Sequence, residues 1–481
     1  MAKLLHEQRR EREVSRSALR RIQTDPHRTQ AREMTTPARI LSEFAARLKY
    51  EDIPPEVVER AKDCVIDTVA ACVFGAELPW TKTVIGYAQR NSAPGESSVL
   101  GTPVKVRAPF ACLANGASAH AFELDALCEP SVGIHPSAAL CVPGLAVSQG
   151  RGKSGREFLT AVVAGYELLY RIGDAARHSI EKVGFHSPGV VGVYGTAAVV
   201  SRLFEVDAAR MANAFGIAGS MSSGLMEFSR SGGMVKRLHL GRAAEGGFMA
   251  AILARDGYTG PAEVFEGKFG FLNVYCRDAD PSRLTKALGS TWHVMKTKLK
   301  RYACHSTAQV PVTLALDLKA RHGIAGEDVE RIAIDANEKT VTQHAINDPR
   351  DMTMMQYSVP FSVAIALYRD PTDPRVFSEA TLNDKKIRAL AKTAEVKPLE
   401  TAAGYMASTA RVTLHLKNGK SVSAEGHDFK GTPTMPLSRD ELREKFLKLT
   451  AHRDRARAER LFSQLAEAEK VTNMRELDFA L

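Results

Sequence analysis

The stretch Gly192-Val-Tyr-Gly-Thr-Ala-Ala198 decides the fold class, because glycine and alanine stand between its apolar residues. A second stretch of the same kind follows at Ala243-Ala-Glu-Gly-Gly247. The distance between two packed helices depends on the side chains at their contact, so small residues let the backbones approach closely. The sequence therefore predicts a tightly packed bundle of helices over residues 189–260.

The helical pattern extends outward from this stretch to about residues 36–275. Ile53-Pro-Pro55 marks a helix start, because proline is favoured in the first turn of a helix. The apolar residues that follow recur at steps of three and four, which predicts one buried helix face. These residues are Val57, Ala61, Cys64, Val65 and Thr68.

After about residue 275 the pattern changes to alternation of apolar and polar residues. Trp292–Lys298, Val329–Ala336 and Arg411–Leu416 alternate in this way, which is typical of half-buried strands. Lys417-Asn-Gly-Lys420 after the last of them predicts a hairpin turn. Residues 276–425 are therefore expected to form a smaller α+β domain.

The C-terminal segment, residues 426–481, is expected to be helical. Ser438 is followed three residues later by Glu441, the spacing of a capping box, which predicts a helix start. The amphipathic pattern continues to about Val471.

The N-terminal segment, residues 1–35, is a basic leader that is expected to be disordered. Residues 1–36 hold nine Lys or Arg and five Asp or Glu, so four of the ten net positive charges lie there. The acidic residues argue against a mitochondrial presequence. Met34-Thr-Thr-Pro resembles a normal start, so the preceding residues are interpreted as an extension or a misassigned start.

Composition excludes several classes of protein. The chain has 481 residues, 44% of them hydrophobic, enough for two or three domains. It contains no basic stripe interleaved with aromatic residues, no apolar run of about 20 residues and no secretory signal, which argues against nucleic acid, membrane and export. Seven cysteines without a CxxC pair favour reduced thiols in the cytoplasm.

A glycine-rich run, Gly216-Ile-Ala-Gly219-Ser-Met-Ser-Ser-Gly224, suggests a nucleotide-binding loop at first sight. It lacks both the GxGxxG and the GK[ST] spacing, and it follows a helical stretch where such a loop follows a strand. The sequence therefore predicts no nucleotide cofactor.

Five histidines stand in short polar islands, and these carry the functional signal. Imidazole exchanges protons near neutral pH, so histidines beside lysines and acids suggest acid–base work on an anionic substrate. The islands are His120-Ala-Phe-Glu-Leu-Asp125, His135-Pro-Ser, Gly184-Phe-His186, Val235-Lys-Arg-Leu-His239 and Lys300-Arg-Tyr-Ala-Cys-His305.

These islands resemble the motifs of the MmgE/PrpD family and stand in the same order. Two further stretches take part in the resemblance, Gly224-Leu-Met-Glu-Phe and Tyr357-Ser-Val-Pro-Phe-Ser362. The resemblance runs from about Thr36 to Leu449. The family includes 2-methylcitrate dehydratases, cis-aconitate decarboxylases and an iminodisuccinate epimerase. It implies a mainly α fold, in which a large all-helical bundle domain carries a smaller inserted α+β lid domain and the C-terminal segment returns to the bundle. It also implies a homodimer.

The resemblance implies the residues of the active site. Carried over residue by residue, the catalytic set is Glu123, Asp125, His135, His186, Lys236, Lys300 and His305. Six further residues are expected to bind the substrate: His120, Arg237, His239, Arg301, Tyr357 and Ser358. The two arginines among them suit carboxylates because a guanidinium can donate two parallel hydrogen bonds.

One motif departs from the family pattern. The family usually has D-x-D-D-T after His-Ala, whereas this chain has Glu123-Leu-Asp125-Ala126-Leu127. The family's threonine lines the pocket in the decarboxylase branch, so its replacement by Leu127 argues against cis-aconitate as the substrate.

The sequence predicts a cofactor-independent lyase that eliminates water from a small hydroxy di- or tricarboxylate, as in 2-methylcitrate dehydratase. A decarboxylase, or an epimerase or isomerase acting next to a carboxylate, is the alternative. A metal-dependent enzyme has less support, because the chain has neither HxxxH nor HExxH spacing. A non-catalytic carboxylate-binding protein also stays open.

Overall fold

The computed structural model describes residues 35–128, 134–177, 179–402 and 408–481. The predicted leader lies almost entirely outside these residues. Pro37–Leu481 form one compact unit, which is mainly helical, as the sequence predicts.

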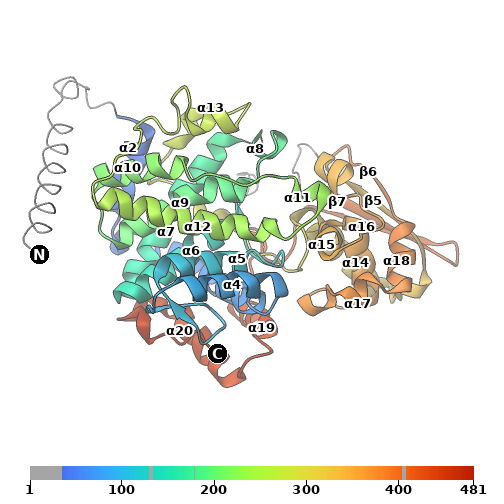
Figure 1. The fold of residues 1–481 in the computed structure, drawn as a ribbon. Helices are drawn as coiled ribbons and strands as arrows, with labels where there is room; N and C mark the ends of the chain where they lie inside the picture. Colours follow the sequence, from blue (N-terminus) through green and yellow to red (C-terminus); the bar gives the residue numbers. More distant parts are fainter. Residues whose placement is uncertain (1–34, 129–133, 178, 403–407) are drawn as a thin grey trace, which may run out of the picture. The chain divides into compact units, whose positions relative to one another are not determined.

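The first part of this unit is a bundle of helices (Figure 1). Helix α9 lies at its centre and contacts α6, α7, α10 and α12, while α12 also packs along α5. The helices are α2 (Pro37–Arg47), α3 (Pro55–Gly75), α4 (Pro79–Asn91), α5 (Ala108–Ala119), α6 (Pro136–Arg151), α7 (Gly155–Ala176), α8 (Ser179–Lys182), α9 (Ser187–Leu203), α10 (Ala208–Gly219), α11 (Phe228–Ser231), α12 (Val235–Arg255) and α13 (Phe271–Tyr275).

The close packing predicted from the glycine- and alanine-rich stretches is confirmed where α9 and α12 cross. A Cβ atom on Gly192 would lie 3.4 Å from the Cβ of Ala243, and one on Gly247 would lie 2.5 Å from the backbone oxygen of Val193. Only glycine fits at the second position without moving the backbone.

We expect Gly247→Ala to destabilise the protein by about 1–3 kcal/mol, the usual cost of overpacking a core. Gly86→Ala in α4 is the matched control, because its new Cβ would meet only the flexible end of Arg90. That control is expected to be neutral or more stable by up to about 1 kcal/mol. Thermal unfolding of both variants measures the difference, and equal midpoints would contradict this view of the crossing.

Helix α3 confirms the start predicted at Ile53-Pro-Pro55. Pro54 is its N-cap residue and Pro55 its first residue. The predicted face, Val57, Ala61, Cys64, Val65 and Thr68, is buried. Of the described helices, none is by itself long and apolar enough to cross a membrane, and only the bent pair α3 and α4 passes that test together.

The second part of the unit is a mixed sheet with helices, which matches the predicted α+β character. The strand order is β6-β5-β7-β8, with β5 and β6 parallel and the other pairs antiparallel. Helix α14 packs on β7 and β8 and also contacts α16. The elements are α14 (Ser306–His322), β5 (Val329–Ala336), α15 (Met352–Tyr357), α16 (Val359–Tyr368), α17 (Glu379–Leu382), α18 (Lys385–Lys392), β6 (Glu395–Pro398), β7 (Ala410–Leu416) and β8 (Ser421–Gly426).

Two of the three predicted strands are confirmed, as β5 and β7. The hairpin turn after β7 is also confirmed, since the Leu416 N–H donates to the Lys420 oxygen at 2.8 Å. Gly419 in this turn has a φ of 82°, a conformation that favours glycine.

The strand predicted at Trp292–Lys298 is wrong for most of its length. Only Thr297–Lys298 form a strand, β4, which pairs with β3 (Leu127–Cys128), and His293–Lys296 form a 3₁₀ turn. The reason is a side-chain network: the ring of His293 lies 3.0 Å from Glu167 and stacks on Tyr170 at 3.8 Å. These contacts hold the segment against α7 in place of a sheet ladder.

The C-terminal helices α19 (Arg439–Leu449) and α20 (Arg455–Ala466) both contact α3. The predicted capping box is confirmed, because the Ser438 N–H donates to Glu441 at 2.8 Å and the Glu441 N–H donates back to the Ser438 hydroxyl. The helix is not continuous to Val471, because Asp454 caps a new helix.

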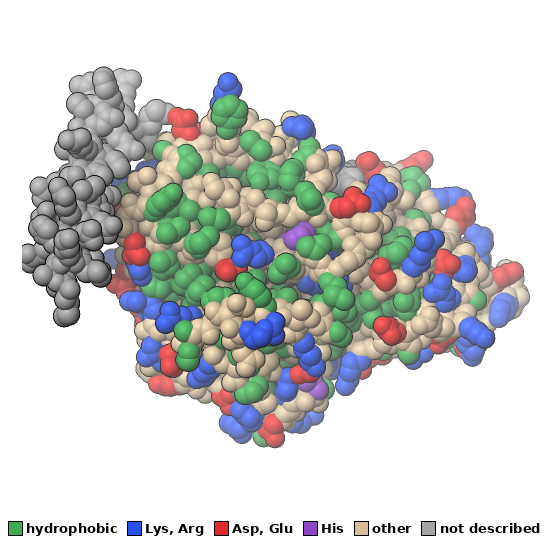
Figure 2. Space-filling view, viewed as in Figure 1, with side chains coloured by type: hydrophobic (Ala, Val, Ile, Leu, Met, Phe, Trp, Pro, Cys, Tyr) green, Lys and Arg blue, Asp and Glu red, His purple; other side chains and the backbone are tan. Residues whose placement is uncertain are grey.

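Charged side chains of both signs are intermixed over the described residues on the face shown in Figure 2. No continuous basic stripe crosses that face, which agrees with the charge pattern of the sequence.

Candidate active site

A cavity of about 1010 Å³ lies between residues of the helical part and residues of the α+β part. The structure brings seven of the predicted site residues to its wall: Glu123, His135, His186, Lys236, Lys300, His305 and Tyr357. Leu127, which stands in place of the family's threonine, also lines the cavity.

The centre of the site is a buried carboxylate between two lysines. Lys236, in the first turn of α12, contacts one oxygen of Glu123, and the Lys300 ammonium donates to the other at 2.8 Å. Burial raises the pKa of Glu123, but the two ammonium groups lower it more, so the net pKa is well below its usual range. Two cations around one anion leave a net positive charge, which suits an anionic substrate.

The two lysines differ in their pKa. Burial lowers the pKa of Lys236, and the neighbouring Lys300 adds to this although Glu123 opposes it. For Lys300, burial also lowers the pKa, but Glu123 and Asp125 raise it more, so its net pKa is above the ordinary value. Lys300 is therefore the more firmly charged of the two.

Glu123 has a φ of 56°, which lies in the left-handed region that residues other than glycine rarely adopt. Strained backbone of this kind costs energy and persists where surrounding contacts enforce it. The two lysine contacts provide that enforcement.

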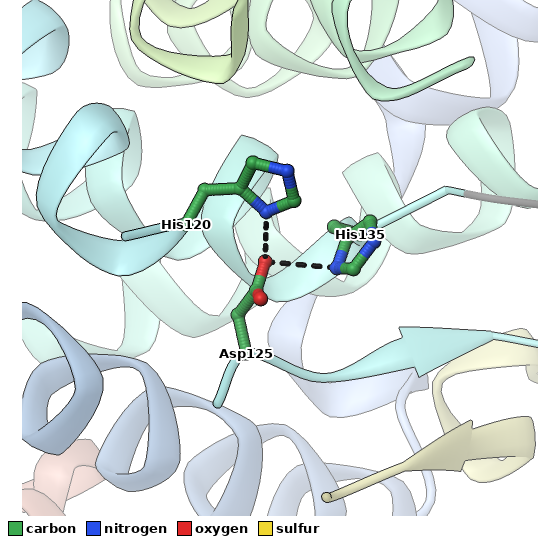
Figure 3. Close-up of side chains that lie close together, drawn as sticks. All are labelled: His120, Asp125 and His135. Carbon is green, nitrogen blue, oxygen red and sulfur yellow. Dashed lines mark hydrogen bonds and ion pairs between the residues drawn. The ribbon is translucent and has the colours of Figure 1, made fainter. Parts of the chain in front are cut away.

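A second cluster joins two imidazoles to one carboxylate (Figure 3). The Nδ1 atoms of His120 and His135 each lie 2.8 Å from the same oxygen of Asp125. Burial raises the pKa of Asp125, but the two histidines lower it more, so it is well below its usual range and the group is a carboxylate. A carboxylate only accepts hydrogen bonds, so Nδ1 of His120, which is hydrogen-bonded to Asp125, carries the proton.

The two histidines of this cluster lie at different depths. His135 is the N-cap residue of α6 and lines the cavity, whereas His120 is fully buried behind it. Burial and the nearby Lys236 lower the pKa of His120 to about 3, against the effect of Asp125. His120 is therefore a neutral support for Asp125.

The ligand-type atoms of this cluster lie within 4.8 Å of one another, so its three side chains could also hold a metal ion. The observed 2.8 Å separations match hydrogen bonds. Ligand atoms around a tetrahedral zinc, about 2.0–2.2 Å from the metal, would lie roughly 3.3 Å apart. The cluster thus fits hydrogen bonding better than metal binding.

We expect a chelator such as EDTA, followed by gel filtration, to leave turnover within about twofold of the untreated protein, because the separations in the cluster are shorter than those between zinc ligands. Adding zinc, manganese or iron back to the treated protein is the control. Loss of turnover that a metal restores would contradict the hydrogen-bonded arrangement.

The next pair of imidazoles is His186 and His239. Their Nδ1 atoms lie 3.1 Å apart, so one donates to the other and the two rings hold opposite tautomers. Burial, together with His120 and Lys236, holds the pKa of His186 well below its usual range, and burial with Lys236 lowers that of His239 to about 4. His186 lines the cavity, and His239 orients it from behind.

His305, the N-cap residue of α14, has a fixed tautomer. Its Nδ1 atom accepts the Thr307 backbone N–H at 3.3 Å, so the proton of the neutral ring lies on Nε2. Burial and the nearby His344 and Lys339 hold its pKa well below its usual range. His305 therefore presents an N–H donor to the cavity.

Five predicted substrate-binding residues are not among the described residues that line the cavity: His120 and His239, which lie behind it, and Arg237, Arg301 and Ser358. The guanidinium of Arg237 lies over the Trp80 ring at 4.6 Å and donates to Thr353 at 2.9 Å. Arg301 is partly buried, and its backbone N–H donates to Gln309. Ser358 caps α16 by accepting the Phe361 N–H at 2.9 Å.

Glu181, Lys339 and His344 are among the cavity residues that the sequence did not indicate. Lys339 and Glu181 form an ion pair of 3.0 Å between the two parts of the unit. Their segments carry no spacing that marks a site, so a sequence pattern could not have found them.

The fold and the cavity define a helical, two-part protein whose site holds buried lysines and neutral imidazoles for an anionic ligand. Comparison with known families matches residues 39–284 to the MmgE/PrpD N-terminal domain and residues 302–468 to the MmgE/PrpD C-terminal domain. The chain therefore belongs to the MmgE/PrpD family, as the motifs indicate.

Three relatives have names that state an activity. The cis-aconitate decarboxylase of Aspergillus terreus is 31% identical over 293 residues, which are 58% of this chain and 59% of that enzyme. The cis-aconitate decarboxylase-like protein oryM of Aspergillus oryzae is 28% identical over 91% of this chain and 95% of its own length. The cis-aconitate decarboxylase of Homo sapiens is 26% identical over 83% and 84%.

Proposed function

We propose that this protein is a cofactor-independent lyase for a small di- or tricarboxylate, and that it decarboxylates an acid of the cis-aconitate type. The relatives are named as decarboxylases, which supports this alternative over the dehydration that the sequence analysis put first. The observation that carries the proposal is the buried pair Lys236 and Lys300 beside neutral histidines.

The lysines provide the electrostatic part of the reaction. Loss of carbon dioxide leaves an electron pair on carbon, which must be spread onto a remaining carboxylate or its conjugated system. Preorganised cations in a buried site stabilise such developing charge strongly, because no solvent has to reorganise. Lys236 and Lys300 are 3% and 1% exposed, which meets this condition.

The histidines provide the proton. The carboxylates of the bound substrate bring negative charge beside His305, which favours its protonated form. We assign this ring as the acid, which takes up a proton with the substrate and gives it to the carbon after carbon dioxide leaves. We assign Nε2 of His135 as the base that keeps the departing carboxyl group ionised. Both rings line the cavity. Groups whose surroundings favour different protonation states divide acid and base roles.

Dehydration is the second candidate, and Leu127 is the observation that favours it. The family's decarboxylase branch has threonine at this place, and the side chain of Leu127 offers the cavity no hydrogen bond. Elimination of water would use the same two imidazoles, with His135 removing a proton and His305 protonating the departing hydroxyl group.

Quantitative product analysis tests the proposal. The protein is incubated separately with cis-aconitate, citrate and 2-methylcitrate, and both carbon dioxide and organic products are measured. We expect one carbon dioxide for each cis-aconitate consumed. If citrate or 2-methylcitrate gives an alkene without carbon dioxide, the reaction is dehydration and not decarboxylation. No reaction with any of the acids would contradict the lyase proposal.

A further inference from the structure

We propose that His344 is a specificity-determining residue, which donates a hydrogen bond to a second carboxylate of the substrate. The inference rests on the lyase proposal and adds to it the requirement that the substrate carry carboxylates at two separate places. His344 ends the π-helical turn Thr340–His344, and such turns are frequent at functional sites.

The first argument is that the ring nitrogens of His344 are buried and lack hydrogen-bond partners among the described residues. It is 2% exposed and lines the cavity, yet neither of its ring nitrogens forms a hydrogen bond of normal geometry with the described residues. Buried polar groups in folded proteins nearly always have partners, and an exception calls for a ligand or a water molecule. A ligand in the cavity would provide that partner.

The second argument is its position beside the proposed acid. The ring of His344 stacks on that of His305 with centroids 4.1 Å apart, and Tyr357 lies 5.3 Å from it. A substrate that receives a proton from His305 therefore lies within reach of His344.

The third argument is the charge around the ring. Burial and the nearby Lys339 lower the pKa of His344 to about 3, against the effects of Glu123 and the Tyr357 backbone. The ring is therefore neutral at physiological pH and offers one N–H donor. Lys339 lines the same side of the cavity, where Glu181 balances its charge.

Two groups of donors, each beside an imidazole, fit a ligand with separated carboxylates. The Lys236 and Lys300 pair would hold the two cis carboxylates that cis-aconitate shares with maleate, and His344 would hold the carboxylate of the acetate arm. Asn337 fixes the turn that carries His344 by accepting the Thr340 N–H at 2.8 Å, so the donor is held in place before the substrate binds.

The test compares two variants and two acids. His344→Phe keeps the aromatic stack on His305 but removes the nitrogens, and His344→Gln restores a donor without the ring. Cis-aconitate is compared with maleate, which lacks the acetate arm of cis-aconitate. Calorimetry measures the Kd of each acid, and turnover of cis-aconitate gives kcat and KM.

We expect His344→Phe to weaken cis-aconitate binding by about tenfold or more, the size of a lost hydrogen bond to a charged group, and to change maleate binding by less than about threefold. His344→Gln should recover part of the loss. Equal weakening of both acids, or none, would overturn the role of His344.

The outcomes separate this inference from the proposed function. Wild-type protein that binds cis-aconitate without converting it would contradict the lyase proposal alone. Wild-type protein that binds neither acid would overturn both. Turnover of cis-aconitate with unchanged KM in His344→Phe would overturn only the inference.

Discussion

Replacing Asp125 by asparagine is expected to lower kcat by about 10²–10⁴-fold while the fold is retained, because an amide cannot hold both neighbouring rings in the same tautomer. In the wild type the Asp125 carboxylate accepts from Nδ1 of His120 and lies equally close to Nδ1 of His135. The NH₂ group of an asparagine would donate to Nδ1 of one ring. That Nδ1 atom would then be an acceptor, so the proton of this ring would move to its Nε2 atom. His135 would then present a donor to the substrate in place of a lone pair.

Initial rates of the wild type and Asp125→Asn under saturating substrate measure this effect. Asp256→Asn is the matched control, because Asp256 is an exposed residue whose ion pair among the described residues is with its neighbour Arg255. The thermal midpoint of each variant shows whether the fold is kept. Unchanged kcat in a folded Asp125→Asn would remove His135 from the proposed base role.

The lowered pKa of Asp125 also predicts how the free energy of unfolding changes with pH. Because the folded pKa is lowered, the stability that the carboxylate contributes is complete above its ordinary pKa of about 3.9 and is lost as the pH falls through the folded value. The difference in unfolding free energy between wild type and Asp125→Asn should therefore be largest at neutral pH and shrink in acid.

Replacing Lys236 by methionine is expected to lower kcat/KM by about 10²–10³-fold, the usual effect of removing one preorganised donor from a buried site. Glu123 would keep only Lys300 as its partner, so the cluster would lose its net positive charge. An anionic substrate would then meet a neutral site. The binding of carboxylates should weaken together with turnover.

Steady-state kinetics of Lys236→Met measure this loss. Lys397→Met in β6 is the control, since its side chain is 60% exposed and, within the part of the chain that the structure describes, forms its ion pair with Glu395 on the surface. A folded Lys236→Met with kcat/KM within about threefold of the wild type would contradict the role of the lysine pair, since removing such a donor usually costs far more.

The sequence predicted the fold in most of its elements, and the reasons are local. Proline at the start of α3, the Ser438 capping box and the turn at Lys417–Lys420 each fix a short segment through neighbours in the chain. Trp292–Lys298 could not be predicted, because its conformation depends on Glu167, more than 120 residues away.

The same difference between local and distant contacts explains which site residues could be predicted. Histidines and lysines in recognisable motifs, such as His135 and Lys236, were found because their neighbours in the chain mark them. Arg237 was expected at the substrate because of its place beside Lys236, but its guanidinium packs on Trp80. His344 was missed because its function depends on contacts with His305 and the cavity, which only the folded chain brings together.

The central claim is that buried lysines and oppositely oriented imidazoles perform acid–base chemistry on a carboxylate. The most direct measurement is NMR of cis-aconitate incubated with the protein in deuterated buffer. We predict that the substrate signals disappear and that each product molecule carries one carbon-bound deuteron from the enzyme's acid. The account would be contradicted if all three acids, cis-aconitate, citrate and 2-methylcitrate, kept their NMR signals and exchanged no proton for deuterium.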